Sequence, residues 1–152
     1  MAFVDGDLSD FPSELSEVVA PIIEDDYDLV IGSRALGELE KGSMTPQQIF
    51  GNWLATTLIQ LIYKYEFTDL GPFRAIKWGQ LMRLDMQDRD FGWTVEMQIK
   101  AAQKKIRWAE VPVRYRTRIG RSKITGTVTG TIRAGWKIVG WILAWRVRLW
   151  LR

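Results

Sequence analysis

Two aspartates near the start of the sequence have the types and the spacing to bind a divalent cation. Asp5-Gly6-Asp7 follows the short apolar run Ala2–Val4 and precedes a predicted helix. In open α/β sheets, ligands gather where strands end. Two carboxylates on such a turn can hold Mg²⁺ or Mn²⁺, and the cation can bridge a diphosphate. A solvated acidic turn that caps the helix would carry the same residues, so both interpretations stay open.

Two basic segments have groups suited to binding phosphate. Arg34 follows a second predicted strand, and its planar guanidinium suits bidentate phosphate binding. A later segment packs three cations and a hydroxyl close together, and these are Arg118, Arg121, Ser122 and Lys123. Such a composition is typical of phosphate-binding loops. A surface arginine and a flexible charged loop are the alternative interpretations.

Two further acidic residues are candidates for catalysis. Asp69 lies in the turn-rich run Thr68–Pro72, where it could orient an acceptor. An aspartate before Gly-Pro is also a common turn former. Glu96 lies on a predicted helix, where a glutamate is usually solvated.

Missing residue types restrict the chemistry further. The chain of 152 residues contains no cysteine and no histidine. This excludes a disulfide scaffold, a thiolate or imidazole metal site, and catalysis that needs a histidine base. A bound metal would therefore be a hard cation held by oxygen ligands.

Charge is divided along the chain. Residues 1–33 contain nine acidic and no basic residues, whereas residues 111–152 contain ten basic and no acidic residues. This division predicts a cation site at one end and an anion site, or an anionic surface partner, at the other. The sequence shows no secretory signal, and its longest uncharged apolar run near the C-terminus, Ile138–Trp145, is far shorter than the roughly 20 residues of a membrane-spanning helix.

Strands and helices that alternate along the chain predict a layered α/β fold. The expected helices include Pro12–Glu24, with Ser9 or Asp10 as N-cap, and Thr45–Tyr65, with Thr45 as N-cap. The other expected elements are the strands Ala2–Val4, Asp28–Gly32, Ile106–Val111 and Val113–Arg118, the turn Thr68–Arg74 and the helix Trp93–Lys105.

The last segment, 127–152, is predicted to form an imperfectly amphipathic helix. One of its faces is apolar and another basic, and four of the eight tryptophans of the chain fall in it. Tryptophan is enriched where protein meets lipid headgroups, so the helix is a candidate for binding a membrane surface. A packing helix with tryptophans in the core is the alternative. The chain is thus divided into a domain over 1–126 and this helix.

Six motifs in order resemble the family-two glycosyltransferases, in the branch of dolichyl-phosphate mannose synthase and the bacterial polyprenyl-phosphate glycosyltransferases. The motifs are DGDLSDFPSEL, DLVIGSR, FGNWLA, TDLGPFRA, GWTVEM and EVPVRYRTRIGRSK. They extend from the start of the chain to about Lys123. The resemblance implies the C-terminal portion of a GT-A fold, an α/β sandwich with a mixed sheet. The family's N-terminal half, which binds the nucleotide base, has no counterpart here.

The resemblance also implies an activity and residue roles. The family transfers a sugar, with inversion, from a nucleotide diphosphate donor to an acceptor that is often a lipid phosphate. Asp5 and Asp7 match the motif that holds Mg²⁺ or Mn²⁺ against the donor diphosphate. Arg34 matches an arginine near the acceptor or transferred phosphate, and Glu96 falls near the family's catalytic base. The basic loop of the family corresponds to Arg118, Arg121, Ser122 and Lys123.

These expectations place the protein in the cytoplasm, at the inner face of the membrane. The expected partners are a nucleotide-sugar, a lipid phosphate, an anionic membrane surface, and a second copy or another chain that supplies the missing half. One alternative is an inactive module that binds a membrane or a partner. Another is a nucleic-acid binder, because aromatic and basic residues alternate in the tail; the acidic first third of the chain disfavours it.

Overall fold

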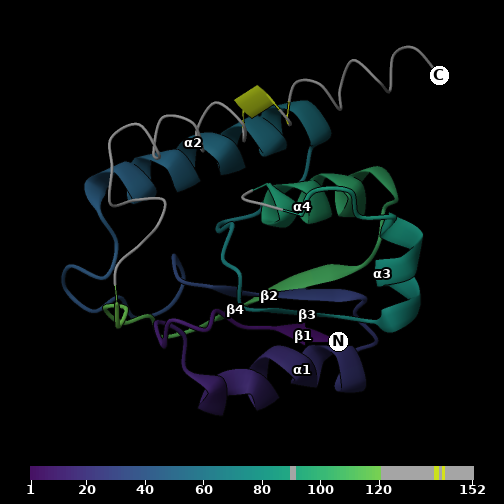
Figure 1. Ribbon diagram of the computed structural model, residues 1–152. Helices are drawn as coiled ribbons and strands as arrows, with labels where there is room; N and C mark the ends of the chain where they lie inside the picture. The colour runs from purple at the N-terminus through teal and green to yellow at the C-terminus, as the bar shows by residue number, and fades with distance from the viewer. Residues whose placement is uncertain (90–91, 121–138, 141, 143–152) are drawn as a thin grey trace.

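The computed structural model describes residues 1–89, 92–120, 139–140 and 142. It has a mixed four-stranded sheet with helices on both faces (Figure 1). The strands are β1 (Ala2–Phe3), β2 (Leu29–Ser33), β3 (Arg74–Ile76) and β4 (Trp108–Pro112). The helices are η1 (Pro12–Glu14), α1 (Leu15–Glu24), α2 (Pro46–Tyr63), α3 (Trp78–Leu84) and α4 (Trp93–Gln103). This confirms the α/β class.

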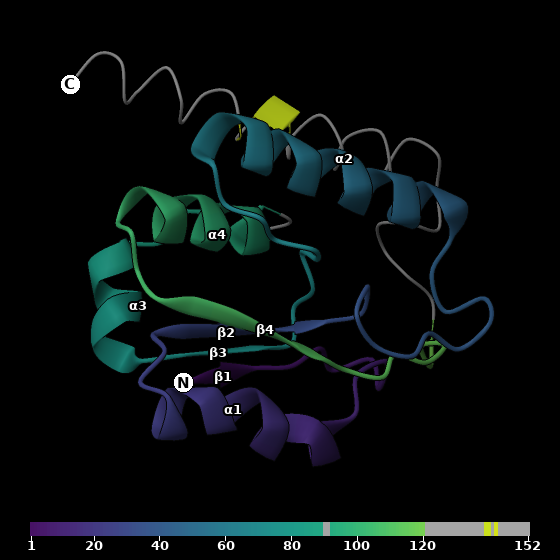
Figure 2. The ribbon, with the colours of Figure 1, turned by 180° about the vertical axis from the view of Figure 1, so that it is seen from behind.

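The order of the strands in the sheet is β1-β3-β2-β4. β3 is antiparallel to both β1 and β2, whereas β2 and β4 are parallel. The carboxyl ends of β1, β2 and β4 therefore lie at the same edge, together with the start of β3. The segments that follow these three strands gather there, at the right of Figure 2. Most of the predicted site residues lie on these segments.

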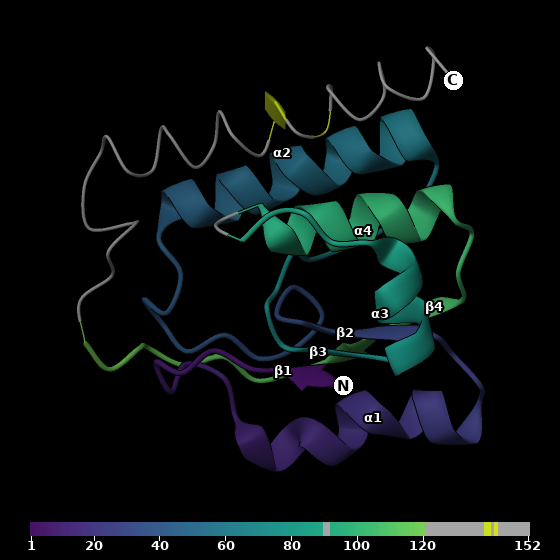
Figure 3. The same cartoon turned by 45° about the vertical axis from the view of Figure 1, so that its right-hand side comes forward.

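Two hydrophobic clusters cover the two faces of the sheet. Alternation along β2 divides its side chains, with Leu29 and Ile31 on one face and Val30 on the other. α1 covers the Val30 face with Val18, whereas α4 covers the opposite face and α2 lies outside α4 (Figure 3).

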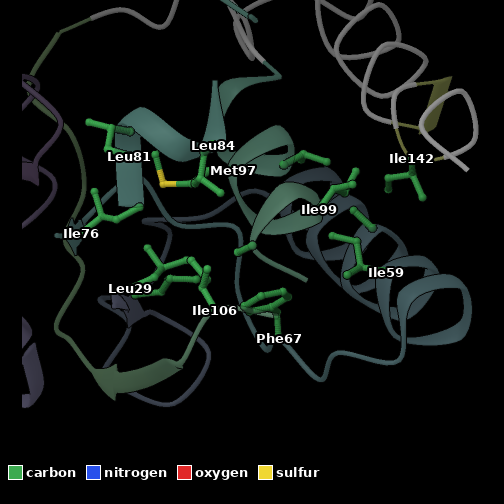
Figure 4. Close-up of a cluster of buried hydrophobic side chains, with 14 residues drawn as sticks. Leu29, Ile59, Phe67, Ile76, Leu81, Leu84, Met97, Ile99, Ile106 and Ile142 are labelled. Atoms are coloured by element: carbon green, nitrogen blue, oxygen red, sulfur yellow. The ribbon is translucent and has the colours of Figure 1, made fainter. Parts of the chain in front are cut away.

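The larger cluster fills the space between the sheet and α4 and extends to α2 (Figure 4). Ile99 of α4 and Ile59 of α2 are buried in it. Ile142 also belongs to this cluster, and its carbonyl oxygen accepts a hydrogen bond of 2.8 Å from the Tyr63 hydroxyl. Apart from residues 139, 140 and 142, the predicted helix over 127–152 lies outside the described residues.

α2 begins where the sequence predicts. Thr45 accepts from the backbone N–H of Gln48, and the Gln48 side chain accepts from the N–H of Thr45. This reciprocal capping box, with Pro46 in the first turn, confirms the predicted start of the helix.

Two local predictions are wrong. Neither Ser9 nor Asp10 caps the first helix, because both side chains act within the loop that precedes it. The segment Val113–Arg118 is not a strand, although its residues alternate; it makes single bridges through Tyr115 to Asp10 and Leu39. Among the described residues, no helix is long and apolar enough to cross a membrane.

Candidate functional site

The acidic loop, residues 5–10, follows β1 and brings three carboxylates together. One oxygen of Asp7 accepts from the backbone N–H of Ser9 at 3.0 Å and from its hydroxyl. Burial raises the pKa of Asp7, but the Ser9 hydrogen bonds and the charge of Arg118 outweigh it and lower the pKa below its ordinary value. The pKa of Asp5 is raised, first by burial and then by the charge of Asp7.

Asp10 is the third carboxylate of this loop, and its position in the sequence predicted only a capping role. It is buried, and one of its oxygens accepts from the backbone N–H of Asp5 at 3.2 Å. Its other oxygen has no hydrogen-bond partner among the described residues. Burial is the main cause that raises the pKa of Asp10 to about 6, and the charges of Asp5 and Asp7 add to it.

A basic segment that follows β4 lies against the acidic loop. The backbone N–H of Arg116 donates to the carbonyl of Ser9, and that of Ile119 donates to the carbonyl of Asp7, both at 3.0 Å. Arg118 Nη2 lies 3.0 Å from the second carboxylate oxygen of Asp7. The structure thus brings Arg118 to the predicted cation site. Arg121, Ser122 and Lys123 lie outside the described residues.

Arg34 follows β2 and is bound in a fork by Asp69. Its Nε and Nη2 donate to the two oxygens of Asp69 at 2.8 and 2.7 Å, and its backbone N–H donates to the same carboxylate at 2.7 Å. The guanidinium also lies 5.0 Å from the centroid of the Tyr115 ring. Burial lowers the pKa of Arg34, but the hydrogen bonds and charge of Asp69 outweigh it and raise the pKa above its ordinary value.

Arg34 and the acidic loop interact electrostatically. The positive charge of Arg34 lowers the pKa of both Asp5 and Asp10, and Arg118 also lowers that of Asp5. The charge of Arg34 thus acts on two carboxylates of the acidic loop, and Arg118 contacts the third, Asp7, directly.

Glu96 makes its contacts elsewhere. It is fully buried on α4, and its carboxylate accepts from the backbone N–H groups of Gln87 and Asp88 at 2.8 and 2.7 Å. It also forms an ion pair of 2.7 Å with Lys100. These contacts fix the loop before α4, and none of them reaches the acidic loop or Arg34. Its role as a base stays a prediction.

A cavity of about 620 Å³ lies beside β1, α3 and α4. Its lining is mainly apolar, with Phe3, Trp78 and Trp93, and none of the predicted site residues lines it. The cavity and the acidic loop are therefore separate features of the fold.

The donor set suits a hard cation in part. Asp5 and Asp7 offer carboxylate oxygens, which are the ligands that hard cations prefer. Among the described residues, no group of three or more acidic side chains is arranged to hold a metal. A cation bound at Asp5 and Asp7 would share the Asp7 carboxylate with Ser9 and Arg118.

Three polar residues near Asp69 went unrecognised in the sequence analysis. Asn52, Gln98 and Glu110 all bind the turn that carries Asp69. Asn52 and Glu110 fall inside the motifs FGNWLA and EVPV, which were noted only for the resemblance. Gln98 has no such signal, because α4 also contains the buried polar residues Glu96 and Lys100.

Comparison with known proteins gives a distant glycosyltransferase relationship. No family model matches the chain. Over 113 residues, 74% of its length, the chain is 28% identical to the glycosyltransferase AglJ of Haloferax volcanii and covers 37% of that protein. Over 130 residues, 83% of its length, it is 26% identical to an uncharacterized protein of Methanocaldococcus jannaschii and covers 54% of it. The chain thus spans about half, or less, of the relatives it matches, and it is similar at a distance to a protein that transfers sugars.

Proposed function

We propose that this chain takes part in glycosyl transfer from a nucleotide diphosphate donor, with a lipid phosphate as acceptor. The observation that carries the proposal is the pairing of the acidic loop with the basic segment at the carboxyl ends of the strands. Asp7 and Arg118 meet there, and Arg34 lies within electrostatic reach. The similarity to AglJ along 74% of the chain supports the same class of reaction.

In this proposal the charged groups stabilise the leaving diphosphate. A Mg²⁺ or Mn²⁺ ion, held by Asp5 and Asp7, would neutralise charge on the diphosphate. Arg118 lies beside the Asp7 carboxylate, so it would contact a phosphate bound at that point. Arg34 would add a fixed positive charge, and fixed charges are most effective where water is excluded.

The acceptor determines whether a base is required. A lipid phosphate is already an anion at neutral pH, so it needs no strong base to attack the donor sugar. Asp69 would then act by holding Arg34, and Glu96 by fixing the loop before α4. Their contacts support these positional roles, because the Asp69 carboxylate binds the guanidinium of Arg34 and the Glu96 carboxylate binds two backbone N–H groups of the loop.

Calorimetric titration tests the donor site. The chain is titrated with UDP-sugars and GDP-sugars, with and without Mn²⁺, beside Asp7→Asn and Asp26→Asn. Asp26 lies in another Asp-x-Asp sequence but is exposed and paired with Lys77, so it is a matched control. We expect Mn²⁺-dependent binding that Asp7→Asn abolishes and Asp26→Asn retains. A folded chain that binds no nucleotide-sugar, or that binds it equally well as Asp7→Asn, contradicts the proposal.

A second candidate is an inactive module that binds a membrane or a partner. The specific observation in its favour is that three large apolar side chains of α2, those of Ile49, Phe50 and Trp53, are exposed. Sedimentation with vesicles of anionic or zwitterionic lipid separates the two candidates when it is combined with the titration. Binding to anionic vesicles without any Mn²⁺-dependent nucleotide binding favours the module.

A further inference from the structure

The turn that carries Asp69, residues 68–71, has no regular secondary structure but is held tightly. Glu110 of β4 binds it from the sheet. The Glu110 carboxylate accepts from the backbone N–H of Thr68 at 2.9 and 3.1 Å and from that of Asp69 at 3.3 Å. It also accepts from the Thr68 hydroxyl at 2.8 Å. One carboxylate therefore satisfies two consecutive peptide N–H groups of an irregular turn.

Two helices bind the remaining polar groups of the same peptides. Asn52 of α2 donates to the carbonyl of Thr68 at 3.1 Å and accepts from the N–H of Leu70 at 2.9 Å. Gln98 of α4, which is fully buried, donates to the carbonyl of Asp69 at 2.8 Å. Side chains from three separate elements thus hold the backbone on both sides of Asp69.

Gly71 leaves the Asp69 carboxylate little room to move. A Cβ added at Gly71 would lie 3.0 Å from an Asp69 carboxylate oxygen and 3.0 Å from the carbonyl oxygen of Gly32. Only a residue without a side chain fits there without displacing one of them. The Asp69 carboxylate is therefore fixed by its backbone on one side and by its neighbour on the other.

We propose that Glu110, Asn52 and Gln98 are positioning residues for the Asp69–Arg34 pair. They hold the turn so that Asp69 fixes the guanidinium of Arg34 beside the acidic loop. The polar atoms that form a site need a rigid surrounding shell, and the buried N–H and carbonyl groups of a turn are costly unless they are bonded. The proposal rests on the proposed function, in which Arg34 is the fixed cation at the leaving diphosphate.

The test observes Arg34, which none of the three residues contacts by any described hydrogen bond. Hydrogen exchange of the Arg34 Nε–H is followed by NMR in the folded chain without added ligand. We expect Glu110→Gln to speed this exchange by tenfold or more, because it removes the negative charge that both N–H groups face and replaces Oε2, an acceptor of the Thr68 N–H and hydroxyl, with an NH2 group. We expect Asn52→Ala to speed it less, since Asn52 binds the outer peptide groups of the turn.

Glu14→Gln is the matched control. Glu14 also accepts a backbone N–H from a distant segment, that of Arg114 at 3.0 Å, but it does not touch the turn. We expect it to leave the Arg34 Nε–H exchange unchanged. The amide of Val30, in the core strand β2, reports global opening in every variant.

Two results overturn the proposal. One is unchanged Arg34 exchange in Glu110→Gln while the Thr68 and Asp69 amides exchange faster. The other is acceleration at Arg34 by the same factor as at Val30 in both Glu110→Gln and Asn52→Ala. Because this experiment contains no nucleotide-sugar, its failure is distinguishable from failure of the titration that tests the proposed function.

Discussion

The two loops that supply carboxylates to this edge of the sheet differ in how completely their polar groups are hydrogen-bonded and in how favourable their backbone conformation is. In the 68–71 turn, every backbone N–H and carbonyl from the N–H of Thr68 to the N–H of Leu70 is bound by a side chain of another element. In the acidic loop, Leu8 has a left-handed backbone with φ 61°, which is unfavourable for a side chain of this kind. Asp10 of that loop also has a buried oxygen without a partner among the described residues.

The ion pair of Arg34 is also more deeply buried than that of Arg118. The side chain of Arg34 is 12% exposed and that of its partner Asp69 is 1% exposed. The side chain of Arg118 is 32% exposed and that of Asp7 is 23% exposed. We infer that the Arg34 half of the site is fixed before any ligand arrives, whereas the Arg118 half can rearrange around one.

The largest expected effect is a loss of folding stability when the Arg34 half of the site is changed. Asp69→Asn leaves Arg34 buried without its counter-charge, and such a loss typically costs about 3–5 kcal/mol. Asp7→Asn removes a partly exposed pair, so we expect a loss below about 1 kcal/mol. Urea unfolding measures both, and similar losses in the two variants would contradict the comparison.

The second prediction concerns the space at the turn. Gly71→Ala forces the Asp69 carboxylate or the Gly32 carbonyl to move, and overpacking of this kind costs about 1–3 kcal/mol. Gly79→Ala is the matched control, because Gly79 lies in α3 and an added Cβ meets nothing within 4 Å. There alanine should stabilise the chain by up to about 1 kcal/mol through helix propensity. Thermal unfolding of the two variants should therefore shift in opposite directions.

The buried carboxylate of Asp10 should make the stability of the protein depend on pH. Since burial raises the pKa of Asp10 to about 6 in the folded state, the folded state binds its proton more tightly than the unfolded state. Stability from this group is therefore greatest below pH about 4, falls as the pH rises to about 6, and is constant above that. Asp10→Asn should remove this decline and raise the stability at pH 7. Urea unfolding at a series of pH values measures this. If the free energy of unfolding declines equally with pH in the unmodified chain and in Asp10→Asn, Asp10 is not the group responsible.

The smallest expected effect is on the binding of metal alone. Arg118 lies against Asp7, so it competes with a cation for that carboxylate. Arg118→Gln should strengthen Mn²⁺ binding by about fivefold or less, the size of a partly exposed ion pair. Arg107→Gln is the control, because Arg107 pairs with Asp26 instead. Calorimetry that finds weaker Mn²⁺ binding in Arg118→Gln would show that Arg118 does not compete.

Signals that lie close together in the sequence predicted much of this fold. The start of α2 follows from Thr45, Pro46 and Gln48 alone, which are consecutive or nearly so. β3 was missed because it is three residues long and contains Arg74, a charged residue that is fully buried. Arg74 is accommodated by carbonyl oxygens of Gly71 and Thr94, and burial lowers its pKa to about 9. No local pattern indicates the contact with Thr94, which is 20 residues away in the sequence.

The candidate site divides in the same way. Asp5, Asp7 and Arg34 were predicted from their positions after strands, and Arg118 from the basic composition of its segment. The structure places the segments that carry them at one edge of the sheet. The fork between Arg34 and Asp69 could not be predicted, because it joins residues 35 positions apart. The alternation in Val113–Arg118 predicted a strand, but only Val113 bonds to β2, at the carbonyl of Ser33, and the rest of the segment bonds to two loops.

The single bridges made by Tyr115 restrict how this protein can vary in length. Tyr115 joins the acidic loop at Asp10 and the segment after β2 at Leu39. An insertion between β1 and Asp10, or between β2 and Leu39, would put these partners out of register. The exposed turn at Lys41 and Gly42 has no such tie. Among homologous chains we therefore expect the first two spans to keep their lengths, and insertions and deletions to accumulate at that turn.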